Sequence, residues 1–221
     1  MIRRGLFAFV AALSLTGFAP PAGDASAPNF VIRLYGRVLG FHLPAGFHPV
    51  TPHSSATQFL MEIVPQGETV ESWTRLITIR SMRGISPAMP SADIATALFD
   101  PKSCTKGHLY RDSAEKPVEG RLRLSIIAIG CGGLPPGIYP AARSGAGEQD
   151  FILMFRDDDA IYTLNYAVRG SAFDGDHPPI DPARAEAVLR AQFGTARVCA
   201  TAAENGCATI IAADTARRAN Q

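Results

Sequence analysis

Hydrophobic and polar positions alternate with a period of two along several short stretches of this chain, which predicts β-strands. The clearest two are residues 151–156 and 161–168, which flank the run Asp157, Asp158 and Asp159. Two such stretches around a short polar run predict a β-hairpin with an acidic turn. Other strand-like stretches lie at 30–34, 38–43, 47–50, 58–64, 74–82, 108–111, 121–130 and 195–198.

Two segments carry the start and stop signals of helices. Ser91 is placed to cap a helix over 92–99, and Asp181 with Pro182 opens one that reaches Phe193 and ends at Gly194. Residues 68–73 leave room for a single helical turn. The pattern as a whole predicts an α+β fold, a mostly antiparallel sheet of about six to eight strands with two helices packed on one side.

The strand predicted at 58–64 has one apolar and one mixed face. Phe59, Met61 and Ile63 lie on the first, whereas Gln58, Leu60, Glu62 and Val64 lie on the second. We therefore expect the face with Gln58 and Glu62 to be exposed. Residues 132–147 are rich in Gly and Pro and show no periodicity, so they are expected to form a long loop.

The N-terminus resembles a secretory signal. Arg3 and Arg4 precede an apolar run from Leu6 to Phe18, which is followed by prolines and small residues, with a cleavage position after Ala25. The run is too short to span a bilayer, so we expect no stable membrane anchor after cleavage. The predicted organisation is a signal peptide at 1–25, one α+β domain at 26–207 and a flexible C-terminal tail at 208–221. The expected location is the periplasm or the medium, and the choice between the Sec and twin-arginine routes stays open.

Charge excludes some partner classes. The chain has 21 Lys and Arg against 20 Asp and Glu, a formal net charge of +1. No cluster of Lys or Arg provides the positive surface that a phosphate backbone or an anionic membrane requires. We therefore expect neither nucleic acid nor a membrane surface as a partner, which leaves a protein or a small-molecule ligand.

Four cysteines in an exported chain favour two disulfide bonds over reactive thiols. Of the three pairings that four cysteines allow, we prefer Cys199 with Cys207, since the Asn205-Gly206 dipeptide between them favours a tight turn. Cys104 would then pair with Cys131. A zinc site is less well supported, because the chain has no Cys-x-x-Cys spacing.

A motif around the single tryptophan carries a family resemblance. Residues 68–79 read Glu-Thr-x-Glu-x-Trp-Thr-x-x-Ile-Thr-Ile after a Val-Pro-x-Gly turn, and Leu-Pro-x-Gly-aromatic occurs at 43–47. These motifs and the later cysteines resemble those of small secreted proteobacterial proteins of unknown function. The resemblance implies export and a compact α+β domain, and the element order is similar to that of Mog1/PsbP-like folds. Trp73, Ile77 and Ile79 are the expected structural core of the motif.

Candidate chemistry is sparse. His42, His48 and His53 could converge on a metal, but nothing in the sequence fixes their geometry. Glu68 and Glu71 could act as an acid/base pair beside Trp73, although carboxylates at the start of a short helix explain them as well. Acidic runs at 157–159 and around 174–176 lack the spacing of a calcium loop and suit solvated turns.

The sequence contains none of the common catalytic motifs that we considered. Gly-x-Ser-x-Gly, the Gly-x-x-x-x-Gly-Lys phosphate loop and His-Glu-x-x-His are all missing from the sequence. We therefore predict no catalytic, cofactor-binding or metal-binding residue. The leading interpretation is a non-enzymatic periplasmic binding or accessory protein of unknown ligand, and the alternative is a hydrolase acting on envelope sugars or peptides.

Overall fold

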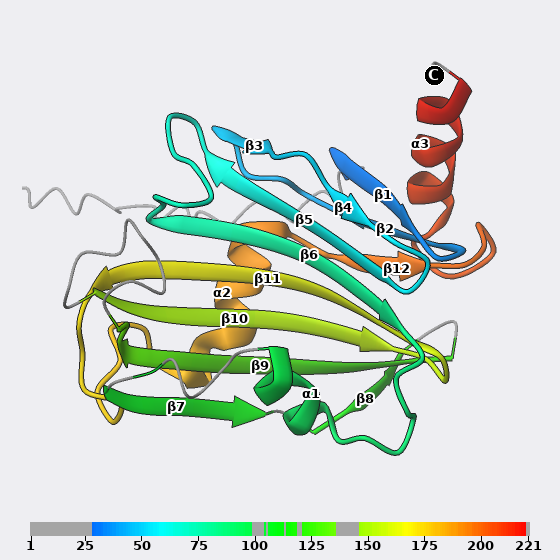
Figure 1. Ribbon diagram of the computed structural model, residues 1–221. Helices are drawn as coiled ribbons and strands as arrows, with labels where there is room; N and C mark the ends of the chain where they lie inside the picture. The colour runs from blue at the N-terminus through cyan, green and yellow to red at the C-terminus, as the bar shows by residue number, and fades with distance from the viewer. Residues whose placement is uncertain are drawn as a thin grey trace, which may run out of the picture.

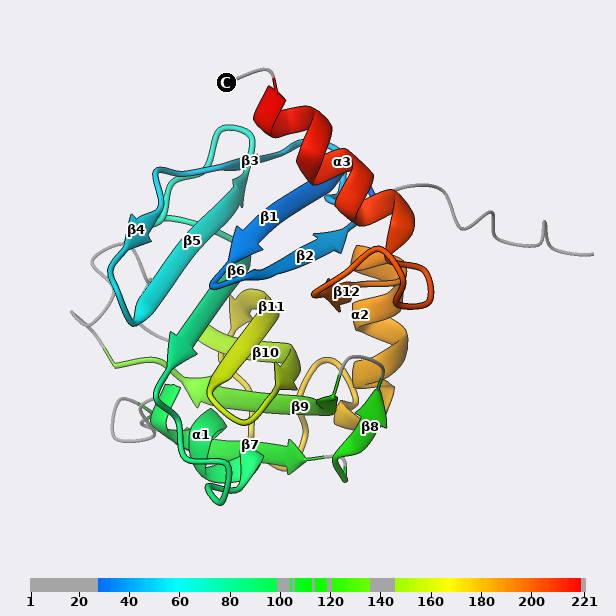
Figure 2. The same ribbon diagram turned by 90° about the vertical axis from the view of Figure 1, so that its right-hand side faces the viewer.

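Two antiparallel sheets and their helices build the protein (Figures 1 and 2). The computed structural model describes residues 28–98, 104, 106–112, 114–118, 121–135 and 146–219. The predicted signal peptide at 1–25 and the centre of the predicted loop, residues 136–145, lie outside the described residues.

The larger sheet has nine strands in its described part, and every pairing within it is antiparallel. Seven strands follow one another across the sheet, and two short ones, β4 and β8, pair with β5 and β9. The path runs through β3 (Phe47–Pro49), β5 (Gln58–Pro65), β6 (Arg75–Arg83), β11 (Ala160–Ser171), β10 (Ala146–Arg156), β9 (Leu122–Gly133) and β7 (Lys106–Asp112), with β4 at His53–Ser54 and β8 at Lys116–Val118.

The smaller sheet contains β1 (Phe30–Leu34), β2 (Arg37–Phe41) and β12 (Arg197–Cys199), in the order β1-β2-β12. It lies on one face of the larger sheet (Figure 1). The helices of the described chain are α1 (Ser91–Leu98), α2 (Ala185–Phe193), preceded by a 3₁₀ turn at Pro182–Arg184, and α3 (Ala208–Ala219).

These elements confirm the α+β class and the mostly antiparallel sheet, but they correct the prediction for the helices. The described residues hold three α-helices rather than two. They also do not share one side: α1 and α2 lie on opposite faces of the larger sheet (Figure 1). None of these helices is long and apolar enough to cross a membrane.

Alternation along the strands creates a core on each face of the larger sheet. On β10, Phe151 and Leu153 point to the smaller sheet and α2, whereas Ile152 and Met154 point to α1. The first core is the larger. It includes Phe193 of α2, which is fully buried and meets Phe41 edge-to-face at a ring-centroid distance of 5.4 Å.

The predicted hairpin is present and longer than its hydrophobic pattern. β10 and β11 pair from Ala146 with Ser171 to Arg156 with Ile161. The segment Ala146–Asp150 has low strand propensity, yet it is buried. It pairs with β11 along its whole length and with β9 from Glu148 onward, and the hydrogen bonds of these ladders outweigh its low propensity. The predicted loop over 132–147 is therefore wrong at both ends, where the residues belong to β9 and β10.

The motif around Trp73 begins with a turn and not with the predicted helical turn. Thr69 and Ser72 form an isolated bridge, exchanging two backbone hydrogen bonds of 3.1 Å. Glu68 then closes the turn by accepting hydrogen bonds from the backbone nitrogen and the hydroxyl of Thr74, at 2.6 and 2.7 Å. Glu68 is thus a structural residue.

Both disulfide bonds have the pairing expected from the sequence. Cys104, which follows α1, pairs with Cys131 on β9, and Cys199 at the end of β12 pairs with Cys207 next to α3. Their Cα–Cα distances are 5.4 and 5.8 Å. The second bridge holds the start of a packed helix and does more than close a loop near a tail.

Helix α3 forms over Ala208–Ala219, within the segment 208–221 that we expected to be a flexible tail. It packs on the outer face of the smaller sheet, where Ile210 is 2% exposed. Gly40 of β2 makes this approach close, because a Cβ atom there would lie 2.9 Å from the Ile210 side chain. Asp214 is fully buried in the same interface, and its Oδ2 accepts hydrogen bonds from Arg33 Nε and Nη2 at 3.2 and 2.5 Å.

We expect Asp214→Asn to lower the free energy of unfolding by about 1–2 kcal/mol at pH 7, because a charge-assisted hydrogen bond is lost. Burial raises the pKa of Asp214, but hydrogen bonds and charges from Arg33 and Arg217 outweigh it, so that the net pKa is lowered. A lowered folded-state pKa gives stability that is present above the unfolded pKa of about 3.9 and lost as pH falls below it. The deficit of the variant should therefore shrink below about pH 4.

Hydrogen exchange of the amides in 208–219 is the measurement, with Arg218→Gln at an exposed position of α3 as the control. Faster exchange in Asp214→Asn alone is the expected result. Equal exchange in both variants would show that the ion pair does not hold α3.

Candidate functional site

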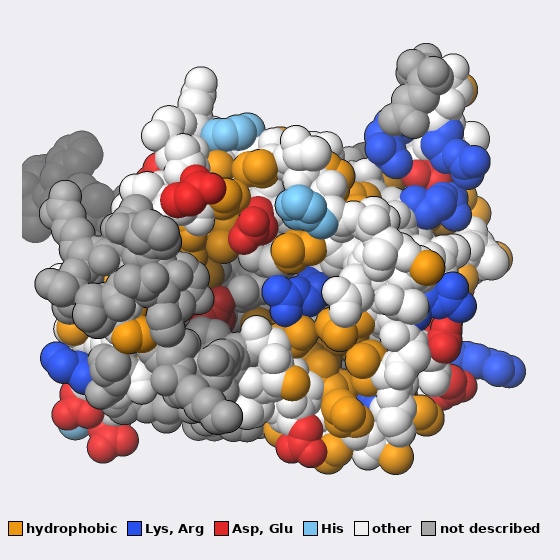
Figure 3. Space-filling view, viewed as in Figure 1, with side chains coloured by type: hydrophobic (Ala, Val, Ile, Leu, Met, Phe, Trp, Pro, Cys, Tyr) orange, Lys and Arg blue, Asp and Glu red, His pale blue; other side chains and the backbone are white. Residues whose placement is uncertain are grey.

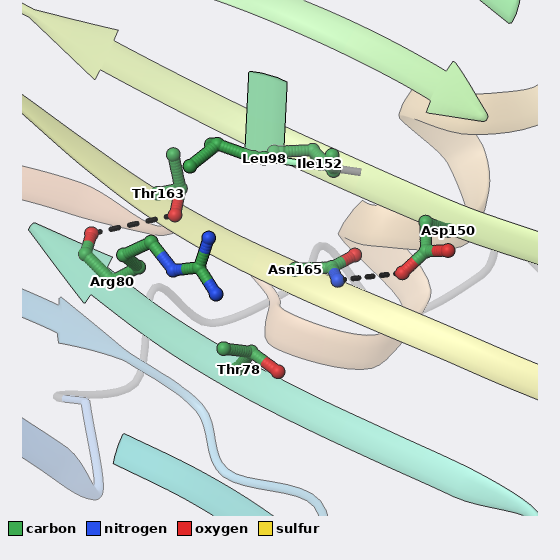
Figure 4. Close-up of a pocket in the computed structure, with 7 residues that line it drawn as sticks. All are labelled: Thr78, Arg80, Leu98, Asp150, Ile152, Thr163 and Asn165. Atoms are coloured by element: carbon green, nitrogen blue, oxygen red, sulfur yellow. Dashed lines mark hydrogen bonds between the residues drawn. The ribbon is translucent and has the colours of Figure 1, made fainter. Parts of the chain in front are cut away.

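A row of polar side chains crosses the α1 face of the larger sheet and lines a cavity of about 80 Å³, the inner cavity (Figure 4). Three central strands supply its polar residues and α1 supplies one edge. The lining consists of Thr78 and Arg80 on β6, Thr163 and Asn165 on β11, Asp150 and Ile152 on β10, and Leu98 at the end of α1.

Strand register explains why these residues meet. Asn165 pairs with Thr78, and Thr163 with Arg80, so the four side chains lie next to one another on one face. The residues between them, Ile79 and Leu164, point to the opposite face and are fully buried there. Period-two alternation thus gives these strands an apolar face and a polar one.

A wider groove of about 460 Å³, the outer groove, adjoins the inner cavity. The two share Arg80 and Leu98, so that Arg80 stands at their junction. On the same side of the molecule, Figure 3 shows charged and histidine side chains next to a group of hydrophobic ones. The remaining lining of the outer groove is His53, Ser54, Ser55, Gln58, Phe59, Leu60, Met82 and Ala97.

Asp150 is the most unusual residue of the inner cavity. It is 5% exposed, and its Oδ1 accepts a hydrogen bond of 2.7 Å from Asn165 Nδ2. Within the described structure, Asp150 Oδ2 and Asn165 Oδ1 are buried without a hydrogen-bond partner. Burial and the nearby charge of Glu148 raise the pKa of Asp150 well above its ordinary value, against the lowering effects of Asn165 and Arg169.

Arg80 supplies positive charge at the junction of the two spaces. Its side chain is half-buried, and its guanidinium points toward Asn165 in Figure 4. Burial lowers the pKa of Arg80 and the carboxylate of Glu62 raises it, with a net lowering. An arginine nevertheless stays protonated in a protein. No described residue forms a hydrogen bond or ion pair with this guanidinium.

A closed cluster lies beside Asp150 on the same face. Glu148 Oε2 accepts hydrogen bonds from Arg169 Nε and Nη2 at 3.1 and 2.7 Å. The Arg169 guanidinium also stacks on the Trp73 ring, 3.6 Å from its centroid. Glu148 is neutralised by Arg169, whereas the carboxylate of Asp150, on the same strand, has no cationic hydrogen-bond partner among the described residues.

Comparison with known proteins does not assign a function to this site. No protein-family model and no curated protein matches this chain. The function is therefore inferred from the residues of the site.

The motif residues singled out from the sequence are structural. Trp73 is 7% exposed and packs with Val64, Leu76 and Ala167 on the α1 face. Ile77 and Ile79 are fully buried on the other face of the sheet. These three residues form parts of two cores and do not line the inner cavity.

The structure does not bring the three histidines together. His42 follows β2 and its backbone nitrogen donates to Phe193 of α2, whereas His48 and His53 lie on β3 and β4, and only His53 lines the outer groove within the described chain. Among the described residues, the one group with metal-ligand spacing is Cys199, Glu204 and Cys207. Both of these cysteines are bonded to each other.

The acidic runs are turns, as the sequence suggested. Asp157 pairs with Arg37 at 2.9 Å and Asp159 with Arg83 at 3.1 Å. Burial raises the pKa of Asp157, but backbone hydrogen bonds and Arg37 outweigh it and lower the pKa. Asp174 accepts a hydrogen bond from the backbone nitrogen of Asp176 in a similar turn.

Sequence reasoning missed the polar residues of the inner cavity. The sequence did contain an indication of them, because Thr78 and Arg80 alternate with the apolar Ile77 and Ile79. Glu62 on the neighbouring strand β5 pairs with Thr78 and lies on the same face of the sheet. The burial of Asp150 was harder to predict, because this residue precedes the apolar part of its strand. The expectation that this face of β5 is exposed holds for Gln58, whereas Glu62 is half-buried beside the site.

Proposed function

We propose that this chain is an exported, non-enzymatic protein that binds a small ligand in the inner cavity and the outer groove. The observation that carries the proposal is the pair of buried oxygens, Asp150 Oδ2 and Asn165 Oδ1, that lack partners among the described residues and line a cavity. An unsatisfied buried polar group costs about 1–3 kcal/mol. A bound ligand that completes these hydrogen bonds would remove this cost.

The size of the site supports a small molecule. Ligand pockets commonly measure about 300–1,000 Å³, a range that includes the outer groove. The inner cavity alone has space for one functional group or a few waters, since one water needs about 10–15 Å³. A ligand would thus place one end in the inner cavity and the rest in the outer groove.

Export is supported by separate observations. The two disulfide bonds fit an oxidising compartment outside the cytoplasm. The signal-like N-terminus and the resemblance of the Trp73 motif to that of small secreted proteins favour the same location. The periplasm is the location that we propose.

A hydrolase is the second candidate, and the two buried carboxylates of β10 are the observation in its favour. Burial raises the pKa of Glu148, only partly offset by Arg169, and the pKa of Asp150 is also raised. A raised pKa is typical of a general acid. However, Glu148 Oε2 accepts two hydrogen bonds from Arg169, which favour the ionised form of Glu148. This makes Glu148 a poor acid/base partner for Asp150.

Thermal-shift and calorimetric titration of the folded chain with amino acids, sugars, organic acids and divalent cations tests the binding proposal. A compound that raises Tm in the wild type should lose this effect in Ala97→Trp, which fills the outer groove. Thr96→Trp, an exposed neighbour on α1 outside the lining residues, is the matched control. Turnover of glycoside or peptide substrates, abolished by Asp150→Asn, would instead favour the hydrolase.

Equal responses of Ala97→Trp and Thr96→Trp to the bound compound would place its site elsewhere. Failure of the whole panel to shift Tm would contradict a small-ligand site.

A further inference from the structure

The two buried oxygens of the inner cavity define what a ligand must offer. Asn165 uses Nδ2 to donate to Asp150, so its Oδ1 remains as an acceptor, and so does the Oδ2 of Asp150 when this carboxyl is ionised. A carboxylate or phosphate has only acceptors and could not complete them while Asp150 is ionised. An ammonium group carries three donors and no acceptor, which suits two neighbouring oxygens.

The charges around the cavity also favour a cation at its inner end. On β10 and β11, Glu148 and Arg169 form an ion pair of 2.7 Å and cancel each other. Asp150 has no cationic hydrogen-bond partner among the described residues. Ionised Asp150 therefore places a negative charge at the inner end of the cavity, with no hydrogen-bonded cation among the described residues to compensate it. A buried charge is tolerated when it is paired, and an ammonium group would pair it.

The junction of the two spaces favours an anion. The Arg80 guanidinium lies there without a hydrogen bond or ion pair from any described residue, and it borders both the inner cavity and the outer groove. Guanidinium groups bind carboxylates through two parallel hydrogen bonds. A ligand that carries both charges close together could reach Asp150 with one and Arg80 with the other.

The outer groove supplies an apolar surface for the remainder of the ligand. Leu60, Met82, Ala97 and Leu98 line the groove, and Leu98 also borders the inner cavity. An aliphatic side chain would bury its surface there, at a gain of about 25 cal/mol for each Å² removed from water.

We propose that the ligand is a free α-amino acid with an apolar side chain. Its ammonium group binds Asp150 and Asn165, its carboxylate binds Arg80, and its side chain occupies the outer groove. This inference rests on the proposed binding function and names the chemical class of its ligand.

A set of matched compounds tests the inference on the wild-type chain by isothermal titration calorimetry. L-leucine is expected to bind, N-acetyl-leucine at least 100-fold more weakly because its ammonium group is lost, and leucinamide at least 10-fold more weakly because its carboxylate is lost. Glycine, which lacks the apolar side chain, should also bind at least 10-fold more weakly. Equal affinity for leucine and N-acetyl-leucine would overturn the assignment of the ammonium site.

Two variants test the residues. Asp150→Asn and Arg80→Gln should each weaken leucine binding at least 10-fold, whereas Arg83→Gln, an exposed arginine on the same strand outside both linings, should leave it unchanged. Circular dichroism first establishes that each variant is folded, and the compound series on the wild type needs no variant at all. Unchanged leucine binding in folded Asp150→Asn would refute the inference.

The failure of the inference can be distinguished from the failure of the proposed function. If a sugar or a dicarboxylate binds and Ala97→Trp blocks it while leucine does not bind, the binding function holds and the amino-acid ligand is wrong. If no compound binds, both are wrong, and the cavity holds water only.

Discussion

Replacing Arg169 by Met is expected to lower the free energy of unfolding by about 3–5 kcal/mol at neutral pH, because it leaves a buried carboxylate without its partner. Arg169 Nη2 lies 2.7 Å from Glu148 Oε2, and each side chain is 7% exposed. The change also removes the guanidinium from the face of Trp73. Urea unfolding followed by far-UV circular dichroism measures the effect without depending on the fluorescence of Trp73.

The loss should depend on pH in a defined direction. Burial raises the pKa of Glu148 and Arg169 lowers it, so the pKa rises further when Arg169 is replaced. A carboxyl whose folded-state pKa exceeds its unfolded value of about 4.3 destabilises the fold above the folded pKa, and protonation relieves the penalty as pH falls. The difference between Arg169→Met and wild type should therefore shrink from pH 7 toward about pH 4.5.

Two further variants separate the pair from other effects. Glu148→Leu combined with Arg169→Met should recover most of the loss, since an apolar pair can replace a buried ion pair at little cost. Arg190→Met removes the exposed pair with Glu186 on α2, whose side chains are 71% and 55% exposed, and should cost less than about 0.5 kcal/mol. If Arg169→Met costs no more than Arg190→Met, the buried pair does not hold these strands together.

Removing the Cys104–Cys131 bridge by a double Ala substitution is expected to cost about 3.5 kcal/mol, and removing Cys199–Cys207 about 2.5 kcal/mol, on the chain-entropy model. The first bridge spans 27 residues and the second 8, so the first constrains the unfolded chain more. Unfolding free energies of the two double variants, measured under non-reducing conditions, test the order.

The position of each bridge adds a second expectation. Loss of Cys199–Cys207 should speed hydrogen exchange in α3, whose first turn follows Cys207, whereas loss of Cys104–Cys131 should leave α3 unchanged. Peptide mapping of the unreduced protein checks the pairing itself. A crossed pairing would contradict both expectations.

Local signals in the sequence were sufficient for several elements because each depends on neighbours along the chain. The hairpin around Asp157–Asp159 follows from period-two alternation on both sides of a turn. Helix α2 follows from Asp181, whose side chain accepts from Ala183 N, and from Gly194, which has a φ of 61°. The α+β class follows from the same elements.

Other features depend on contacts between distant segments, which local patterns do not encode. The tail at 208–221 has a weak apolar pattern, yet α3 forms because Ile210 packs over Gly40 and Asp214 pairs with Arg33, 181 residues away in the chain. The placement of α1 and α2 on opposite faces is also set by packing, because either face of the sheet offers apolar side chains.

The candidate site likewise combines features encoded by local sequence with features that depend on contacts between distant segments. Alternation along β6 places Thr78 and Arg80 on one face of the strand and Ile77 and Ile79 on the other, and this pattern can be read along the chain. The placement of Asn165 on β11 and Asp150 on β10 beside them depends on strand order and register, which join residues far apart in the chain and exist only in the folded protein. Burial of Asp150 then raises its pKa and leaves an oxygen without a partner in the described structure, a property that no local pattern could reveal.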